Sequence, residues 1–137
     1  MVRIDIRYEG ELRFSAVHTP SGTELSTDAP VDNHGRGESF SPTDLLATSL
    51  GACMATIMGV AAAKHDADLS GMRITVVKTM VADPDRRVGK LQVVFHVPED
   101  PGEKLRTLLE RAAHHCPVHR SLHPDIDVGT LFRWGHA

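Results

Sequence analysis

The chain is 137 residues long and 41% hydrophobic, which fits one domain with one sizeable core. Lys and Arg number 15 against 18 Asp and Glu, giving a formal charge of −3, and only 4% of the residues are aromatic. This composition argues against a nucleic-acid partner, which needs basic patches and stacking platforms. We therefore expect a single domain over residues 1–137.

The first quarter of the sequence predicts a meander of three strands. Apolar and charged residues alternate along residues 2–9, which is the period of a strand with one buried face. The alternation returns over residues 12–16, and a turn cluster at 19–22 separates it from a third short strand at 24–27. The amino terminus lacks the continuous apolar stretch of a secretory signal, so we expect a cytoplasmic protein.

A loop and a long helix follow the meander. Residues 28–40 are polar and longer than most connections, which is typical of a functional loop. Ser41 can then serve as N-cap, Pro42 as the first helical residue and Asp44 as the carboxylate of a capping box. The pattern predicts a helix that runs to about Lys64 or His65.

No charge interrupts this helix from residue 45 to residue 63, so a membrane span has to be weighed. Small residues outnumber Leu and no aromatic belt flanks the segment, so we interpret it as a core helix. The stripe expected to face the core is Leu46, Leu50, Cys53, Ile57 and Val60. The opposite faces carry small residues, and one small domain cannot cover a helix of about 35 Å on every side. We therefore predict a homodimer.

The second half predicts a hairpin of residues 72–83 and 88–97. Its buried face is expected to carry Leu91, Val93 and Phe95. A capped helix then ends at Cys116, before a short helix to about residue 122 and a closing strand over residues 126–134. The order is βββ-α-ββ-α-α-β, an α+β arrangement in one domain.

The two cysteines lie 63 positions apart in a chain that needs no disulfide to fold, so a structural disulfide is not expected. Cys53, in the middle of the apolar helix, can be a small core residue or a redox thiol. Cys116 precedes Pro117 and can cap the short helix, whose N-terminus favours a thiolate. If the two helices cross, both sulfurs could meet.

Histidines gather around the second cysteine. His114, His115 and His119 flank Cys116, and imidazole and thiolate both suit zinc or copper. The spacing matches no established metal motif, because adjacent helical residues point about 100° apart. We therefore predict no metal site.

Three motifs resemble one known family. They are Ser41-Pro42-Thr43-Asp44-Leu45-Leu46, Leu50-Gly51-Ala52-Cys53 and Cys116-Pro117-Val118 with Arg120 downstream. Together with the element order and the glycine-containing loop before the first cysteine helix, they resemble the OsmC/Ohr family of thiol peroxidases. The resemblance covers nearly the whole chain.

The resemblance implies an OsmC-like fold in an intertwined homodimer with central helices, and an active site shared by both subunits. Cys53 resembles the peroxidatic thiol and Cys116 the resolving thiol. In the family an arginine from the amino-terminal strands activates the first cysteine. Arg13 is the best match by position, while Arg7 and Arg36 are alternatives.

One position departs from the family pattern. Peroxidases of the family carry a glutamate directly after the Asn/Ser-Pro pair, where this chain has Thr43. Asp44 is better explained as a cap, and Glu38 could reach the arginine only if the preceding loop folds over it. The sequence therefore resembles a divergent branch of the family.

The expected activity is reduction of organic hydroperoxides through a Cys53 sulfenic acid and a Cys53–Cys116 disulfide. A cellular dithiol would reduce that disulfide, and no cofactor is expected. The small apolar residues around Cys53 favour alkyl or fatty peroxides. The alternative is a binding module that holds a small hydrophobic molecule at the dimer interface without turning it over.

Overall fold

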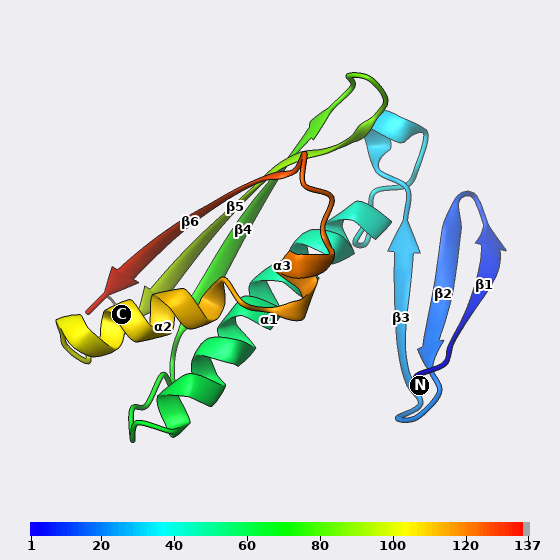
Figure 1. Cartoon of the computed structure of the whole chain (residues 1–137). Coiled ribbons are helices and arrows are strands. Elements are labelled where there is room, and N and C mark those ends of the chain that lie inside the picture. The colour runs from blue at the N-terminus through cyan, green and yellow to red at the C-terminus, as the bar shows by residue number, and fades with distance from the viewer. Residues whose placement is uncertain (136–137) are drawn as a thin grey trace. The chain divides into compact units, whose positions relative to one another are not determined.

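The chain divides into two compact units, Met1–Leu46 and Ala47–Ala137, each described by itself. The computed structural model describes residues 1–135 (Figure 1). In chain order the elements are β1 (Ile4–Gly10), β2 (Arg13–His18), β3 (Thr23–Asp28), the 3-10 turn η1 (Val31–Asn33), α1 (Pro42–Ala63), β4 (Arg73–Val81), β5 (Arg87–Val97), α2 (Glu103–Ala113), α3 (Pro117–Ser121) and β6 (Asp127–Trp134). The predicted order and the α+β class are confirmed, and the expectation of a single domain stays a prediction.

In the first unit, β1, β2 and β3 form an antiparallel meander. β2 and β3 pair from His18 opposite Thr23 to Arg13 opposite Asp28, so that the two strands are symmetric about the turn. Residues directly opposite each other share a face of the sheet. One face is apolar and exposed, and it carries Ile4, Ile6, Tyr8, Phe14 and Leu25.

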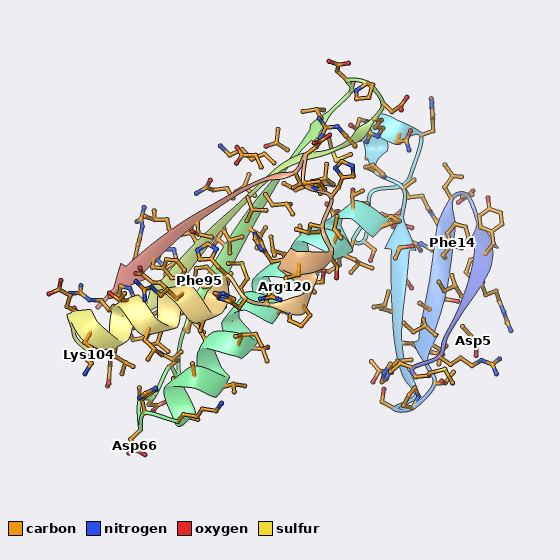
Figure 2. The ribbon with its side chains drawn as sticks, viewed as in Figure 1. Asp5, Phe14, Asp66, Phe95, Lys104 and Arg120 are labelled. Atoms are coloured by element: carbon orange, nitrogen blue, oxygen red, sulfur yellow. The ribbon has the colours of Figure 1, made fainter. Side chains whose placement is uncertain are left out.

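In the second unit, β4 pairs antiparallel with β5, and β6 joins β5 in parallel. A parallel neighbour needs a crossover connection, which α2 and α3 supply between β5 and β6. Leu91, Val93 and Phe95 are fully buried on one face of β5, as the alternation predicted. Phe95, labelled in Figure 2, is one of these residues. Its ring stacks on that of Phe132 of β6 with centroids 4.6 Å apart.

Helix α1 buries a different stripe from the one expected. Its buried residues are Ala47, Leu50, Gly51, Met54, Met58 and Ala62. Cys53 and Ile57 are half-buried, and Val60 is 51% exposed. Leu46 is also half-buried, so the predicted stripe was wrong for four of its five members, and Cys53 lies beside the core face rather than within it.

Close approach of α1 to β4 explains this choice of face. A Cβ on Gly51 would lie 2.8 Å from Val76 Cγ2 and 3.3 Å from Ile74 Cγ2. The absent side chain lets the helix backbone approach the sheet, so small residues take the packed side.

By length and composition alone, α1 could cross a bilayer, but core helices of soluble proteins meet the same criterion. In the described fold 33% of its most apolar window is buried. The other side of the helix carries half-buried and exposed apolar residues. The homodimer predicted from this helix stays a prediction.

Helix α2 packs against β6 and ends earlier than expected. Leu109 and Ala113 are its buried residues, and Trp134 of β6 donates an indole hydrogen bond of 2.8 Å to Glu110. Cys116 is not the last residue of this helix, because a residue before proline disfavours the helical region. It adopts an extended conformation and is the N-cap of α3 instead.

Candidate active site

Two thiols from different helices of the second unit lie together. Cys53 comes from the middle of α1 and is half-buried. Cys116 is fully buried at the N-cap of α3, where its sulfur accepts the backbone N–H of His119 at 3.2 Å. The two cysteines are not joined by a disulfide in this structure.

The two thiols differ in their electrostatic surroundings. Burial raises the pKa of Cys116, and contact with the Cys53 thiol raises it further, against the opposing hydrogen bond from His119. The expectation that the helix N-terminus would favour a thiolate at Cys116 is therefore wrong in its net direction. Burial disfavours the charged form of a thiol, and this effect outweighs the backbone N–H groups of His119 and Val118, which favour it.

The contact has a chemical consequence. Cys116 retains its proton and can donate it to the Cys53 sulfur, while Cys53 is the sulfur with access to solvent. Two sulfurs in hydrogen-bonding contact can join as a disulfide once one of them is oxidised. The pair therefore has one accessible thiol and one buried partner.

In the first unit, Arg13 makes a two-point ion pair with Asp28. Arg13 Nε donates to Asp28 Oδ1 and Nη2 donates to Oδ2, both at 2.7 Å. The Arg13 side chain is 27% exposed, whereas that of Asp28 is fully buried. The Arg13 hydrogen bonds lower the pKa of Asp28, and the same contact raises the pKa of Arg13.

The loop after β3 folds back onto this pair. The backbone N–H of Glu38 donates to Asp28 Oδ2 at 3.0 Å, and the Glu38 carboxylate lies 3.8 Å from Arg13 Nη2. Glu38 thus approaches Arg13 in the way the sequence left open. Arg36, an alternative to Arg13, instead pairs with Glu11 and Glu38.

The start of α1 is capped as predicted. The Asp44 backbone N–H donates to Ser41 Oγ at 3.1 Å, and the Asp44 carboxylate accepts the Ser41 N–H at 2.9 Å. The Thr43 hydroxyl lies 3.2 Å from Ser41 Oγ. Asp44 therefore acts as the cap.

Sequence reasoning missed Asp28. A signal was present, because a hairpin symmetric about the turn at residues 19–22 places residue 28 directly opposite Arg13. The strand was expected to end at residue 27, which left Asp28 in the loop.

The histidines near Cys116 have other partners. His114 Nε2 lies 3.4 Å from the Thr130 hydroxyl, and His115 Nδ1 lies 2.7 Å from the Arg111 carbonyl. Burial lowers the pKa of His114. Among residues 1–135, no group of three or more His, Cys, Asp or Glu side chains is arranged to hold a metal ion.

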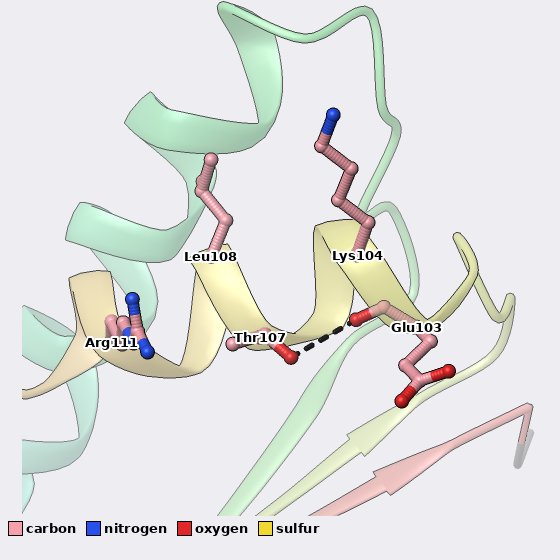
Figure 3. A pocket seen from close by; sticks show the side chains of 5 residues that line it. All are labelled: Glu103, Lys104, Thr107, Leu108 and Arg111. Carbon is pink, nitrogen blue, oxygen red and sulfur yellow. Dashed lines mark hydrogen bonds between the residues drawn. The ribbon is translucent and has the colours of Figure 1, made fainter.

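Two hollows lie along α2. One is lined by Glu103, Lys104, Thr107, Leu108 and Arg111, with the Thr107 hydroxyl donating to the Glu103 carbonyl at 3.1 Å (Figure 3). The other lies near the start of the helix; it shares Glu103, Lys104 and Leu108 with the first and is also lined by His65, Pro101, Gly102 and Leu105. Neither is lined by a cysteine, so neither belongs to the thiol pair.

The family model described as OsmC-like protein matches residues 35–130, a stretch that contains both cysteines. The chain belongs to the OsmC-like family. No match was found among the curated proteins.

Solved structures of OsmC-like proteins agree with this membership. A Psychrobacter arcticus protein, provisionally described as an osmotic stress induced and detoxification response protein, is 44% identical over 96% of each chain, with a TM-score of 0.91. An organic hydroperoxide resistance protein OsmC from Legionella pneumophila is 16% identical, covers 97% of this chain and 96% of its own, and has a TM-score of 0.79. An OsmC-like protein from Mycoplasma pneumoniae is 13% identical over 99% and 98% of the two chains, with a TM-score of 0.81. The last two similarities show the fold.

Proposed function

We propose that this OsmC-like protein reduces organic hydroperoxides with Cys53 and Cys116. The observation that carries the proposal is the contact between an accessible thiol and a buried, protonated one. The name of the Legionella pneumophila structure, an organic hydroperoxide resistance protein, supports the substrate class.

In the proposed reaction the Cys53 thiolate attacks the distal peroxide oxygen, the one that carries hydrogen, and the O–O bond breaks. Cys53 becomes a sulfenic acid, and the other oxygen takes up a proton and leaves as an alcohol. The Cys116 sulfur then attacks the Cys53 sulfur and the S–OH bond breaks. Water leaves with the Cys116 proton, and a disulfide remains. A dithiol returns both cysteines to thiols by exchange.

Arg13 has the role of activating cation in this proposal. A guanidinium favours a thiolate over a thiol, and it stabilises the negative charge that develops on the leaving oxygen. The partial exposure of Arg13 supports the assignment. Its Nε and Nη2 donate to Asp28, and its Nη1 group makes no hydrogen bond to that carboxylate.

We also propose a homodimer in the cytoplasm. The support for the homodimer is the exposed apolar face of the first sheet and the uncharged, half-covered side of α1. Apolar faces of this extent mark association surfaces in soluble proteins.

Thiol titration before and after one equivalent of cumene hydroperoxide per chain tests the proposal. We expect two thiols per chain to disappear, with a mass loss of two hydrogen atoms and no covalent dimer on a non-reducing gel. Full retention of both thiols would favour the alternative, a module that binds a small hydrophobic molecule without turnover. Covalent dimers as the main product would contradict the pairing within one chain.

A further inference from the structure

Helix α2 of the second unit carries two cations that the fold does not use. Lys104 and Arg111 are exposed, and neither side chain forms an ion pair or a hydrogen bond with another of residues 1–135. Arg106 of the same helix differs, because its Nε lies 3.4 Å from Asp100 Oδ1. The charges of Lys104 and Arg111 are therefore available to a bound molecule.

The sequence explains why these two charges have no partner on their own helix. Ion pairs on a helix surface join residues three or four positions apart. None of the four such positions around Arg111 is acidic, and the one acid around Lys104 is Asp100, which pairs with Arg106. The pattern thus leaves one side of α2 positive.

An exposed apolar side chain lies between the two cations. Leu108 is 36% exposed, and it follows Lys104 by four residues and precedes Arg111 by three. These spacings place the three side chains on one side of the helix. Figure 3 shows Lys104 and Leu108 pointing to the same side of α2, whereas the Glu103 carboxylate points to the other side.

The two hollows along α2 meet at these residues. Lys104 and Leu108 line both hollows, Arg111 lines the first, and the half-buried Leu105 adds apolar surface to the second. Their volumes are about 550 and 490 Å³, which is the size of sites that hold small molecules. This part of the surface therefore offers both apolar contact and room for a ligand.

Charge decides which class of ligand fits. The charged residues that line the hollows are Lys104, Arg111 and Glu103, two positive and one negative. The Thr107 hydroxyl already donates to the Glu103 carbonyl, so the two cations are the strong donors that remain on this side. A ligand with a single negative charge and an apolar chain matches this lining.

We propose that this side of α2 is a second binding site, which takes a medium-chain carboxylate. The two cations lie two turns apart, about 10 Å along the helix axis, and both side chains are long enough to reach a carboxylate placed between them. The hydrocarbon chain of the ligand lies along Leu108 and Leu105. The site contains no cysteine, so it does not depend on the proposed peroxidase activity.

Octanoate is the probe, titrated into the reduced full-length protein while backbone amide shifts are followed by NMR. We expect the largest shifts in residues 103–111 and a Kd on the order of 1 mM, as suits a small ligand on an open surface. Acetate has the charge without the chain, and 1-octanol has the chain without the charge. Each should bind about fivefold more weakly or worse.

Variants separate contact with the ligand from a general effect of charge. Lys104→Gln and Arg111→Gln should each weaken octanoate binding about two- to fivefold, the effect of one exposed ion pair. Lys90→Gln is the matched control, because Lys90 is an exposed residue of β5 that lines neither hollow. The control should bind octanoate as the parent does.

Several results would overturn the proposal. They are shifts centred on the exposed apolar face of the first sheet, equal binding of octanoate and 1-octanol, parental binding in both Lys104→Gln and Arg111→Gln, or an equal loss in Lys90→Gln. Because the titration uses reduced protein without peroxide, a failure of this proposal and a failure of the proposed peroxidase activity are distinguishable.

An anionic lipid surface offers similar chemistry and needs its own measurement. Phosphatidylcholine vesicles with and without phosphatidylglycerol are sedimented with the protein, which should stay in the supernatant, since its net charge of −3 opposes an anionic surface. Sedimentation that depends on phosphatidylglycerol and is lost in Lys104→Gln would assign this side of α2 to a membrane and overturn the proposal of a free carboxylate.

Discussion

Substitution of Gly51 by alanine tests how α1 packs against β4. That packing determines why Cys53 lies beside the core face. In Gly51→Ala the new Cβ would lie 2.8 Å from Val76 Cγ2 and 3.3 Å from Ile74 Cγ2. The first contact is too short for carbon atoms, and Val76 is β-branched and cannot rotate away freely. The helix or the strand must therefore shift.

The expected change in the free energy of unfolding has two parts. Overpacking a core position costs about 1–3 kcal/mol. Replacing glycine by alanine within a helix gains about 1 kcal/mol. The net effect of Gly51→Ala is thus a loss of up to about 2 kcal/mol.

Gly59→Ala is the matched control, because Gly59 lies in the same helix and a Cβ there would meet no atom within 4 Å. The helix-propensity gain is common to both variants, so Gly51→Ala should be less stable than Gly59→Ala by about 1–3 kcal/mol. Urea unfolding measures the difference, and light scattering checks that both variants keep the oligomeric state of the parent. A Gly51→Ala protein as stable as Gly59→Ala would refute the packing described for α1.

Three further predictions follow from burial and charge. Because burial raises the pKa of Cys116, iodoacetamide at pH 7 should label Cys53 before Cys116. Peptide mass spectrometry measures the order of labelling, and unfolding in urea should abolish the difference between the two cysteines. Faster labelling of Cys116 in the folded protein would contradict the assignment. The pKa of Asp28 is lowered in the folded state, so its pairing stabilises the fold above the unfolded carboxyl pKa and is lost as pH falls through the folded value. Asp28→Asn should therefore flatten the acid side of a plot of unfolding free energy against pH, and an unchanged slope would argue against the pair. Light scattering at low micromolar concentration should give the mass of a dimer, and a folded monomer of 14.9 kDa would contradict the association inferred from the apolar faces.

Much of the fold follows from local pattern. Alternation with period two places the strands, and the Ser41, Pro42 and Asp44 sequence starts α1 where the structure starts it. Proline chemistry also predicts that Cys116 caps α3. These features depend on neighbours in sequence, so the sequence suffices to predict them.

The rest depends on contacts between distant segments. The buried face of α1 could not be chosen from its hydrophobic residues, because the close approach of Gly51 to β4 decides it. The net shift of the Cys116 pKa depends on burial by the whole second unit, which the N-cap position alone does not reveal. The pairing of Asp28 with Arg13 follows from the register of the hairpin between β2 and β3. Because the third strand was expected to end one residue too early, at residue 27, this pairing was not predicted.

The central claim is that Cys53 is the thiol that peroxide oxidises and Cys116 the thiol that resolves it. Dimedone trapping in Cys116→Ser tests this directly, because a sulfenic acid without a resolving thiol persists long enough to be labelled. One equivalent of cumene hydroperoxide should give one dimedone adduct, located on Cys53, and Cys53→Ser should consume no peroxide. A dimedone adduct on Cys116 in the Cys53→Ser protein would reverse the roles, and no adduct in either variant would contradict the peroxidase assignment.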